Sequence, residues 1–237
     1  MSRPSPNLAA GLLDVFVSPA SLFRALPEGR WWGWAAFALI IAASAISTYA
    51  FIGPMSPEWI VEQQILQMGD RLSDPELERI RPQLESMAPH TAAFSVIGAV
   101  ATTGLMIVLV GSLYMLLARL ATSGPRRGWG TWLRFTTWTQ LPLVAYSLGL
   151  IVLALIAPGP DQPMSLLGYA SLNNLVLDLP PGHRWYSLAL GLSLFTLWSL
   201  VLAAIGMRVW TNASTVRSAL LAVVPWALVF GTWALIP

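Results

Sequence analysis

The chain has 237 residues, of which 56% are hydrophobic and only 10% are charged. An ordinary soluble domain carries about a quarter charged residues, so this composition argues against a water-soluble globular domain, a disordered tail and a nucleic-acid-binding domain. The formal net charge of +2 is too small to predict an anionic partner. With no cysteine, the chain has no disulfide, thiolate metal site or thiol nucleophile.

Thirty residues precede the first long apolar stretch and form the predicted N-terminal segment, 1–30. A cleaved signal peptide would need a short basic start and an apolar stretch of about 7–15 residues, which this segment does not match. Within it, residues 8–26 predict two short helices that lie on the cytoplasmic membrane surface, or alternatively a linker packed on the bundle. Ser18 is the expected N-cap and Pro19 the first helical residue of the second helix. The apolar residues of the two helices fall at helical spacing: Leu12, Leu13, Val15 and Phe16, then Leu22, Phe23 and Leu26.

Five long stretches without Arg, Asp or Glu predict an all-α polytopic membrane protein, a five-transmembrane-helix bundle with short interfacial amphipathic helices. A helix needs about 20 apolar residues to cross the hydrocarbon core, and each stretch is that long. Helices are expected because every backbone group must be paired within the segment, and the residues do not alternate as in barrel strands. The membrane domain is predicted at residues 31–237, with spans near 31–53, 92–118, 133–157, 185–207 and 216–236.

The external loop, residues 54–91, is the largest polar part of the chain and is acidic. An amphipathic helix is expected around Trp59, Ile60, Leu66 and Leu72. A second helix should begin at Asp74 and Pro75, with Glu76 and Glu78 in its first turn and a kink or division at Pro82. Its apolar stripe comprises Leu77, Ile80, Leu84 and Met87. These helices are expected to cap the bundle or to bind a partner.

A third amphipathic segment is predicted at residues 165–179. It places apolar side chains on one side, namely Leu166, Tyr169, Leu172, Val176 and Leu179.

Arginine placement predicts the orientation of the spans, because basic residues remain on the cytoplasmic side. The N-terminal segment and the second and fourth loops carry nine Arg and two acids: Arg3, Arg24, Arg30, Arg119, Arg126, Arg127, Arg134, Arg208 and Arg217 against Asp14 and Glu28. The first and third loops carry four Arg and nine acids. The N-terminus is therefore expected in the cytoplasm and the C-terminus, Pro237, outside. Use of Arg without Lys suggests a GC-rich bacterial genome and hence the inner membrane, with a periplasmic C-terminus.

Candidate chemistry is sparse. His90 and His183 fall in external loops without a second His or Cys nearby, so no metal site is expected. The sequence contains no Gly-rich phosphate loop and no nucleophile elbow, and no cofactor is predicted. The centres of the spans lack Asp, Glu, Lys and His, which argues against a pump or proton-coupled carrier but leaves a passive pore or lipid pathway open.

The few polar intramembrane residues lie on the second and third spans: Thr102, Thr103, Arg134, Thr136, Thr137 and Gln140. Pro142 frees a backbone carbonyl near Trp138, so the cytoplasmic end of the third span should be kinked. One interpretation is a hinge or the lining of a small cavity. The other is hydrogen bonding that holds helices together, a common packing device in membranes.

Two compositional features have structural interpretations. The first span contains many small residues, which suit either an internal packing face or an oligomer face. Most of the tryptophans fit an aromatic belt at the membrane interfaces, including Trp31, Trp32, Trp34, Trp129, Trp132, Trp185, Trp226 and Trp233.

Residues 11–26, followed by Trp31, resemble the opening of bacterial members of the Yip family, which are Ypt/Rab-interacting-protein-like membrane proteins with five spans. The resemblance rests on Asp14, Pro19 and Phe23, on Pro142 inside the third span, and on the closing run 204–220. Two features depart from the family: Asp14 and Pro19 lie one residue further apart than in the eukaryotic Asp-Leu-Tyr-Gly-Pro motif, and no Gly-Tyr pair precedes Pro142. The family implies a helical membrane domain, oligomerisation and, in eukaryotes, a role in Rab-linked membrane traffic.

Three functions remain to be compared. The first is a non-enzymatic, membrane-organising scaffold that acts as a homo-oligomer, with membrane lipids and a membrane-protein partner but no nucleic acid. The second is a passive channel or a protein that translocates lipids or small molecules through the polar patch on spans two and three. An intramembrane enzyme has the least support, because no nucleophile–base pair is visible.

Overall fold

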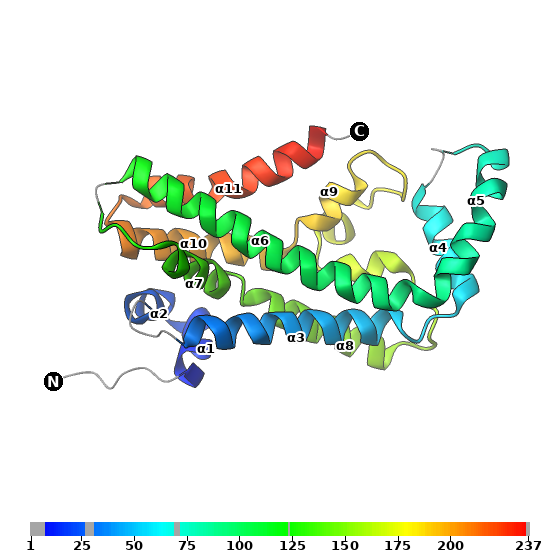
Figure 1. Cartoon of the computed structure of the whole chain (residues 1–237), viewed down its shortest axis with the longest axis horizontal. Coiled ribbons are helices and arrows are strands. Elements are labelled where there is room, and N and C mark those ends of the chain that lie inside the picture. The colour runs from blue at the N-terminus through cyan, green and yellow to red at the C-terminus, as the bar shows by residue number, and fades with distance from the viewer. Residues whose placement is uncertain (1–7, 27–30, 69–71, 123, 236–237) are drawn as a thin grey trace. The chain divides into compact units, whose positions relative to one another are not determined.

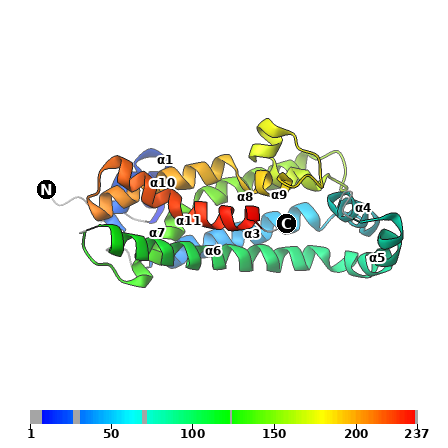
Figure 2. The same cartoon turned by 90° about the horizontal axis from the view of Figure 1, so that it is seen from above.

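The computed structural model describes residues 8–26, 31–68, 72–122 and 124–235. Within these ranges every named element is helical, and the single β-type pairing is an isolated bridge between Ser171 and Ser193. The longer helices, which can be followed in Figures 1 and 2, are α1 (Leu8–Val17), α2 (Pro19–Ala25), α3 (Trp32–Ile52), α4 (Pro57–Met68), α5 (Asp74–Met87), α6 (Thr91–Ala121), α7 (Trp129–Thr139), α8 (Pro142–Ile156), α9 (Tyr186–Gly191), α10 (Leu194–Thr211) and α11 (Thr215–Leu235). The predicted all-α class is confirmed.

Five helical stretches among the described residues are long and apolar enough to cross a membrane. They are Trp32–Ile52, Asp74–Ala121, Trp129–Ile156, Leu194–Thr211 and Thr215–Trp233. The second stretch joins α5 to α6 through a short 3-10 turn, Ala88–His90. The number of membrane-spanning helices therefore agrees with the number predicted from the charge-free stretches.

The fourth span differs from its predicted range, 185–207, because the helix is interrupted. Leu192 has an extended backbone and separates α9 from α10. The amide of Leu172 donates to the carbonyl of Leu192 at 2.6 Å, and the amide of Leu194 donates to the carbonyl of Ala170 at 3.0 Å. The adjacent loop thus satisfies the backbone groups that the broken helix leaves open, as non-helical backbone in a membrane protein requires. The spanning helix begins at Leu194, nine residues after the predicted start.

The chain divides into two compact units, each assembled from separate stretches. Of the described residues, unit 1 comprises 8–26, 31–42, 102–122, 124–144 and 195–235, and unit 2 comprises 43–68, 72–101 and 145–194. Each unit has its own buried apolar cluster.

The N-terminal helices α1 and α2 belong to the core of unit 1. Ser18 is the N-cap of α2 and Pro19 its first residue, as predicted. Leu22, Phe23 and Leu26 are at most 1% exposed and pack in the buried cluster. The predicted apolar face of α2 is therefore covered by protein, whereas in α1 Leu13 and Phe16 remain exposed. Helical spacing predicts that a helix has an apolar face, but it does not predict whether lipid or protein covers that face.

In unit 2 the loop after α8 holds the beginning of α4. The Asp161 carboxylate accepts hydrogen bonds from the backbone amide of Ser56 at 2.7 Å and from its hydroxyl at 3.0 Å. The Trp59 indole donates to the carbonyl of Gln162 at 2.9 Å, and the buried Gln63 side chain accepts from the amide of Met164 at 3.0 Å. A charged acceptor and two further bonds fix where α4 begins.

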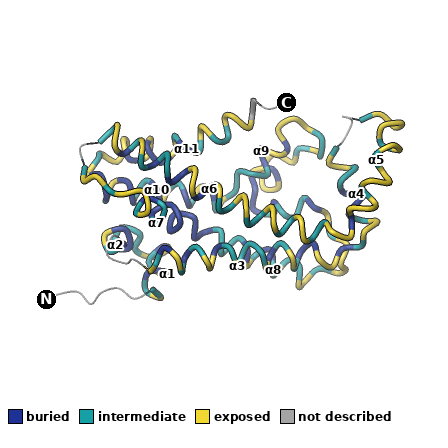
Figure 3. Tube along the Cα trace, viewed as in Figure 1, coloured by how far each residue is buried: buried dark blue, intermediate teal, exposed yellow. Residues whose placement is uncertain are grey.

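Helix α5 begins as predicted but is not divided at Pro82. The amide and the hydroxyl of Ser73 both donate to one carboxylate oxygen of Glu76, at 2.8 and 2.7 Å, and Pro75 lies in the first turn. This arrangement satisfies groups that an exposed helix start would otherwise leave to water. The helix continues through Pro82 to Met87. None of its residues is fully buried (Figure 3). Leu77, Ile80 and Leu84 form the half-buried side.

The predicted amphipathic segment 165–179 consists of a 3-10 turn, Met164–Gly168, and a π turn, Asn173–Leu177. Asn173 is buried, and its side-chain amide exchanges two hydrogen bonds with the backbone of Leu179, at 3.0 and 3.3 Å. Leu172 and Val176, which helical spacing would place on one apolar side, are exposed. Irregular turns replace the expected helix, so the helical spacing does not apply to these residues.

The tryptophans assigned to the aromatic belt differ in exposure. Trp31, Trp34, Trp129, Trp185 and Trp233 are exposed, in agreement with an aromatic belt. Trp132 is 2% exposed and lies in the core of unit 1, so its assignment to the belt was wrong.

The orientation of the spans remains a prediction. Several residues used to derive it lie outside the described residues, namely Arg3, Glu28, Arg30, Asp70, Arg71 and Pro237.

Candidate functional site

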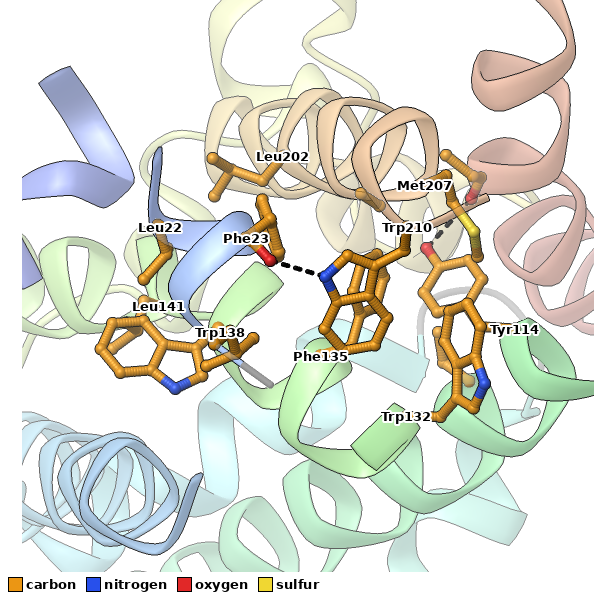
Figure 4. Packing of buried hydrophobic residues seen from close by; sticks show 14 of the residues in the cluster. Leu22, Phe23, Tyr114, Trp132, Phe135, Trp138, Leu141, Leu202, Met207 and Trp210 are labelled. Atoms are coloured by element: carbon orange, nitrogen blue, oxygen red, sulfur yellow. Dashed lines mark hydrogen bonds between the residues drawn. The ribbon is translucent and has the colours of Figure 1, made fainter. Parts of the chain in front are cut away.

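The predicted polar patch on the third span lies on α7, which also supplies the centre of the core of unit 1. Phe135 and Trp138 are fully buried. The ring of Phe135 lies 5.1 Å from Phe23, 5.6 Å from Tyr114 and 4.9 Å from Trp210, measured between ring centroids (Figure 4). Tilted and edge-to-face contacts at these separations stabilise a cluster beyond simple burial.

Two hydrogen bonds cross this cluster between helices that are distant in sequence, and both are drawn in Figure 4. The Trp210 indole donates to the backbone carbonyl of Phe23 at 2.7 Å. The Tyr114 hydroxyl donates to the carbonyl of Ala222 at 3.1 Å. Because all of these groups are buried, the bonds fix α2 against α10 and α6 against α11.

The threonine hydroxyls of α7 are bonded to the helix itself. Thr136 Oγ1 donates to the carbonyl of Trp132 at 3.0 Å, Thr137 Oγ1 to Leu133 at 2.9 Å, and Thr139 Oγ1 to Thr136 at 2.8 Å. Each hydroxyl therefore uses its only proton within one helical turn and has none to donate to a permeating solute. This pairing favours a packing role for the threonines over the lining of a polar pathway.

The helix is interrupted where Pro142 predicts a kink. Helix α7 ends at Thr139, and the amide of Gln140 is shared between the carbonyls of Thr136 and Thr137, both at 3.1 Å. The carbonyl of Trp138 accepts instead from the amide of Leu141 at 3.4 Å, and α8 begins at Pro142. The side chain of Gln140 is 6% exposed, and its Nε2 is buried without a hydrogen-bond partner.

A cavity of about 580 Å³ lies on the opposite side of α7, within unit 1. Its walls are largely apolar, with Trp34, Phe37, Ile107 and Leu133, and it also contains Thr131, Arg134 and Thr137. Arg134 donates from Nη2 to Thr131 Oγ1 at 3.2 Å. A side chain on Gly33 would collide with the Arg134 Cγ atom, so the glycine lets the arginine stem cross α3.

The polar residues of the second span are not gathered with those of the third. Helix α6 approaches α7 at Gly111, where a Cβ atom would lie 3.0 Å from Thr136 Oγ1. Thr102 precedes Gly111 by about 13 Å of helix rise and is exposed, and Thr103 is half-buried. The residues Thr102, Thr103, Arg134, Thr136, Thr137, Gln140 and Pro142 thus occupy several separate environments.

The three residues of the family-like N-terminal motif have different roles. Asp14 is half-buried, and its carbonyl accepts the amide of Ser18 at 3.0 Å where α1 meets α2. Pro19 begins α2, and Phe23 contributes its ring and its carbonyl to the core. The sequence identified these positions but not their partner Trp210, because the pairing joins segments 187 residues apart.

Among the described residues, no group of three or more His, Cys, Asp or Glu is placed to hold a metal ion. His90 and His183 are both exposed.

Comparison with known proteins identifies the family. A family model described as the Yip1 domain matches residues 13–236, which contain Asp14, Pro19, Phe23, Pro142 and all five membrane-length helices. No curated protein and no solved structure matches the chain. Since the match covers nearly the whole chain, the resemblance seen in the sequence is confirmed, and the chain is an integral membrane protein that belongs to the Yip1 domain family.

Proposed function

We propose that the chain is a non-enzymatic scaffold of the bacterial inner membrane, which organises membrane partners and acts as a homo-oligomer. The observation that supports this role is the exposed side of α6. Of the five membrane-length stretches, the one that contains α6 is the least covered by the chain itself. Only 11% of its apolar 18-residue segment is buried inside the protein.

The exposed side of α6 combines large apolar side chains with small ones. Phe94 is 56% exposed and Ile97 is 64% exposed. Gly98 and Ala101 lie on the same side, and no atom would come within 4 Å of a Cβ at Gly98. Small residues allow two helix backbones to approach closely, which favours helix association in lipid over simple lipid contact.

Disulfide cross-linking in native membranes tests the oligomer, and the absence of natural cysteine makes each introduced thiol unique. Ala101→Cys should give a covalent dimer under mild oxidation. Leu155→Cys, on an exposed position of α8, is the matched control and should remain monomeric. Equal cross-linking of the two variants, or none from Ala101→Cys, would contradict an interface on α6.

A second pair of variants tests the close helix approach itself. Gly98→Leu in the Ala101→Cys background should abolish the cross-link, because leucine separates the two backbones. Gly231→Leu is the control, since Gly231 also has nothing within 4 Å of its Cβ position but lies on α11. A cross-link that survives Gly98→Leu would show that small residues do not form the contact.

A second candidate function, translocation of lipid or small molecules, is favoured by the 580 Å³ cavity with Arg134 beside apolar walls. An anionic headgroup could pair with the guanidinium while an acyl chain lies against Trp34 and Phe37. Reconstituted liposomes with fluorescent phospholipid would reveal scrambling by dithionite quenching. This candidate requires activity that falls with Arg134→Gln, Thr137→Val or Gln140→Leu; activity unchanged in all three variants excludes this pathway.

A further inference from the structure

A smaller cavity, of about 320 Å³, lies in unit 1 beside the connection between α6 and α7. Three arginines line it, namely Arg119 from the last turn of α6 and Arg126 and Arg127 from the connection. Thr122, Trp132 and Thr211 complete most of the wall. This cavity is distinct from the one beside Arg134 and shares no lining residue with it.

The charged hydrogen-bond donors among the lining residues are the three arginine guanidinium groups. Thr122 Oγ1 donates to the carbonyl of Ala118 and Thr211 Oγ1 to the carbonyl of Met207, each at 2.7 Å, so neither hydroxyl proton is free. No acidic side chain is among the described residues that line the cavity. Three like charges around one space repel one another, and an anion between them would remove that repulsion.

Arg127 is held in position more firmly than a surface arginine. Its guanidinium carbon lies 4.6 Å from the centre of the Trp210 ring, and Trp210 is itself fixed by its bond to Phe23. Arg127 Nε is shielded from solvent and has no hydrogen-bond partner. Burial lowers the pKa of this guanidinium from its ordinary value.

The walls of the cavity are closely packed. A Cβ on Gly124 would lie 2.9 Å from the Thr211 Cα atom, so only glycine allows the connection to run against the end of α10. The indole of Trp132 packs edge-on against Trp210, with 5.3 Å between ring centroids. Residues of the core therefore position Arg127 and the wall formed by Gly124, Trp132 and Thr211, whereas Arg119 and Arg126 are exposed at the rim.

We propose that Arg119, Arg126 and Arg127 form a binding pocket for a phosphate group, supplied by an anionic phospholipid headgroup or by free phosphate. Arginine forks match phosphate oxygens in two-bond geometry, and basic pockets at the cytoplasmic ends of membrane helices suit lipid headgroups. The volume accommodates a phosphate with a small substituent. The proposal does not depend on the scaffold or translocation role.

A structural role for these arginines makes a different prediction. Cationic side chains near the ends of α6 and α10 also interact favourably with the carbonyl ends of the helices. That interaction needs no ligand, so it would leave the stability of the protein independent of phosphate.

The experiment measures thermal unfolding of the full chain in nanodiscs. Discs of phosphatidylcholine alone are compared with discs containing phosphatidic acid, and separately with phosphatidylcholine discs titrated with inorganic phosphate. A rise in the midpoint with phosphatidic acid only assigns the pocket to a lipid headgroup, and a saturable rise with inorganic phosphate assigns it to the free ion. No rise in either arm overturns the proposal.

Charge-matched variants show whether any rise comes from this pocket. Arg126→Gln, whose side chain is exposed, should weaken phosphate binding about tenfold while leaving the contact between Arg127 and Trp210 intact. Arg127→Lys keeps the charge but loses the fork and should also bind more weakly. Arg217→Gln removes one exposed positive charge from α11, outside the cavity, and should bind as the unmodified chain does. Equal losses in Arg126→Gln and Arg217→Gln would mean that only general surface charge attracts phosphate, and the pocket would be excluded.

Discussion

Trp210 connects two segments that are 187 residues apart through one buried hydrogen bond. The same indole ring contacts Phe135 and supports the guanidinium of Arg127, so a single residue joins α2, α7 and the connection before α7. Removing the indole N–H would leave the carbonyl of Phe23 buried without a donor, and an unpaired buried acceptor costs more than an average hydrogen bond contributes.

Trp210→Phe should lower the free energy of unfolding by about 1–3 kcal/mol, because it removes this donor while keeping an aromatic ring. Chemical denaturation in detergent micelles, followed by circular dichroism, measures the change. Trp31→Phe is the control, since Trp31 is 82% exposed, and it should leave stability unchanged. Equal stability of Trp210→Phe and the unmodified chain would show that the bond to Phe23 contributes little.

Gln140→Leu should raise the free energy of unfolding by about 1 kcal/mol, because it replaces a buried amide whose Nε2 has no partner with an apolar side chain of similar size. The same denaturation measurement applies. Thr139→Val is the comparison, because it removes a hydroxyl that is bonded to Thr136, and it should not stabilise the protein. A large loss of stability in Gln140→Leu would indicate that the amide makes a necessary polar contact.

At the scale of helices, the beginnings were predicted more successfully than the interruptions. Ser18 with Pro19 predicted the start of α2, and Asp74 with Pro75 predicted the start of α5, because these signals are local in the sequence; the bond from Ser73 to Glu76 was found only in the structure. The break before α10 depends on two hydrogen bonds with a neighbouring segment, in which the Leu172 amide donates to Leu192 and the Leu194 amide donates to Ala170, and no charge or proline marks it. Local patterns cannot reveal a break whose stabilising partners come from another part of the chain.

The start of α5 should depend on pH. Hydrogen bonds from the Ser73 amide, and then from its hydroxyl, lower the pKa of the Glu76 carboxyl from its ordinary value of 4.5. The ionised form is thus favoured in the helix, so its stabilising effect is complete above the ordinary pKa and is lost as pH falls through the lowered value. Hydrogen exchange of the Leu77 amide, which donates to the carbonyl of Ser73, should accelerate relative to the intrinsic rate over that acidic range.

Glu76→Gln should remove this pH dependence, and Glu85→Gln, nearer the end of α5, should preserve it. If the unmodified chain and Glu76→Gln respond to acid in the same way, the Ser73–Glu76 pair does not control the helix start.

For the whole molecule, the composition predicted a lipid environment, and the charge-free stretches predicted the number of membrane-length helices. Both predictions follow because a lipid bilayer requires long apolar helices and excludes charged side chains. The candidate site was predicted less well. Thr136 and Thr137 of α7 and the adjacent Gln140 are buried, as expected of packing residues. Thr102, in contrast, is exposed on a different helix, α6. The arginine cavity was counted only as loop charge, because its walls come from residues 118–132 and Thr211, which are far apart in sequence. Spacing along one helix cannot show which distant helix completes a site.

The predicted orientation can be tested with single cysteines in the otherwise cysteine-free chain. Glu85→Cys should react with a membrane-impermeant maleimide added to intact cells, because loop 54–91 is expected outside. Gly128→Cys, also at an exposed position, should react only after the membrane is permeabilised. The reverse pattern, or labelling of both in intact cells, would contradict the five-span orientation.

The discontinuity of unit 1 has a consequence for biosynthesis. Its core needs Phe23, Tyr114, Phe135 and Trp210, which leave the ribosome at widely separated times. Until α10 has been translated, the carbonyl of Phe23 cannot accept the hydrogen bond from the Trp210 indole. The apolar side of α2 then lacks the residues that bury it in the finished protein. During that interval the bilayer surface is the nearest apolar environment, so the membrane would shelter the nascent N-terminal helices before the finished protein encloses them.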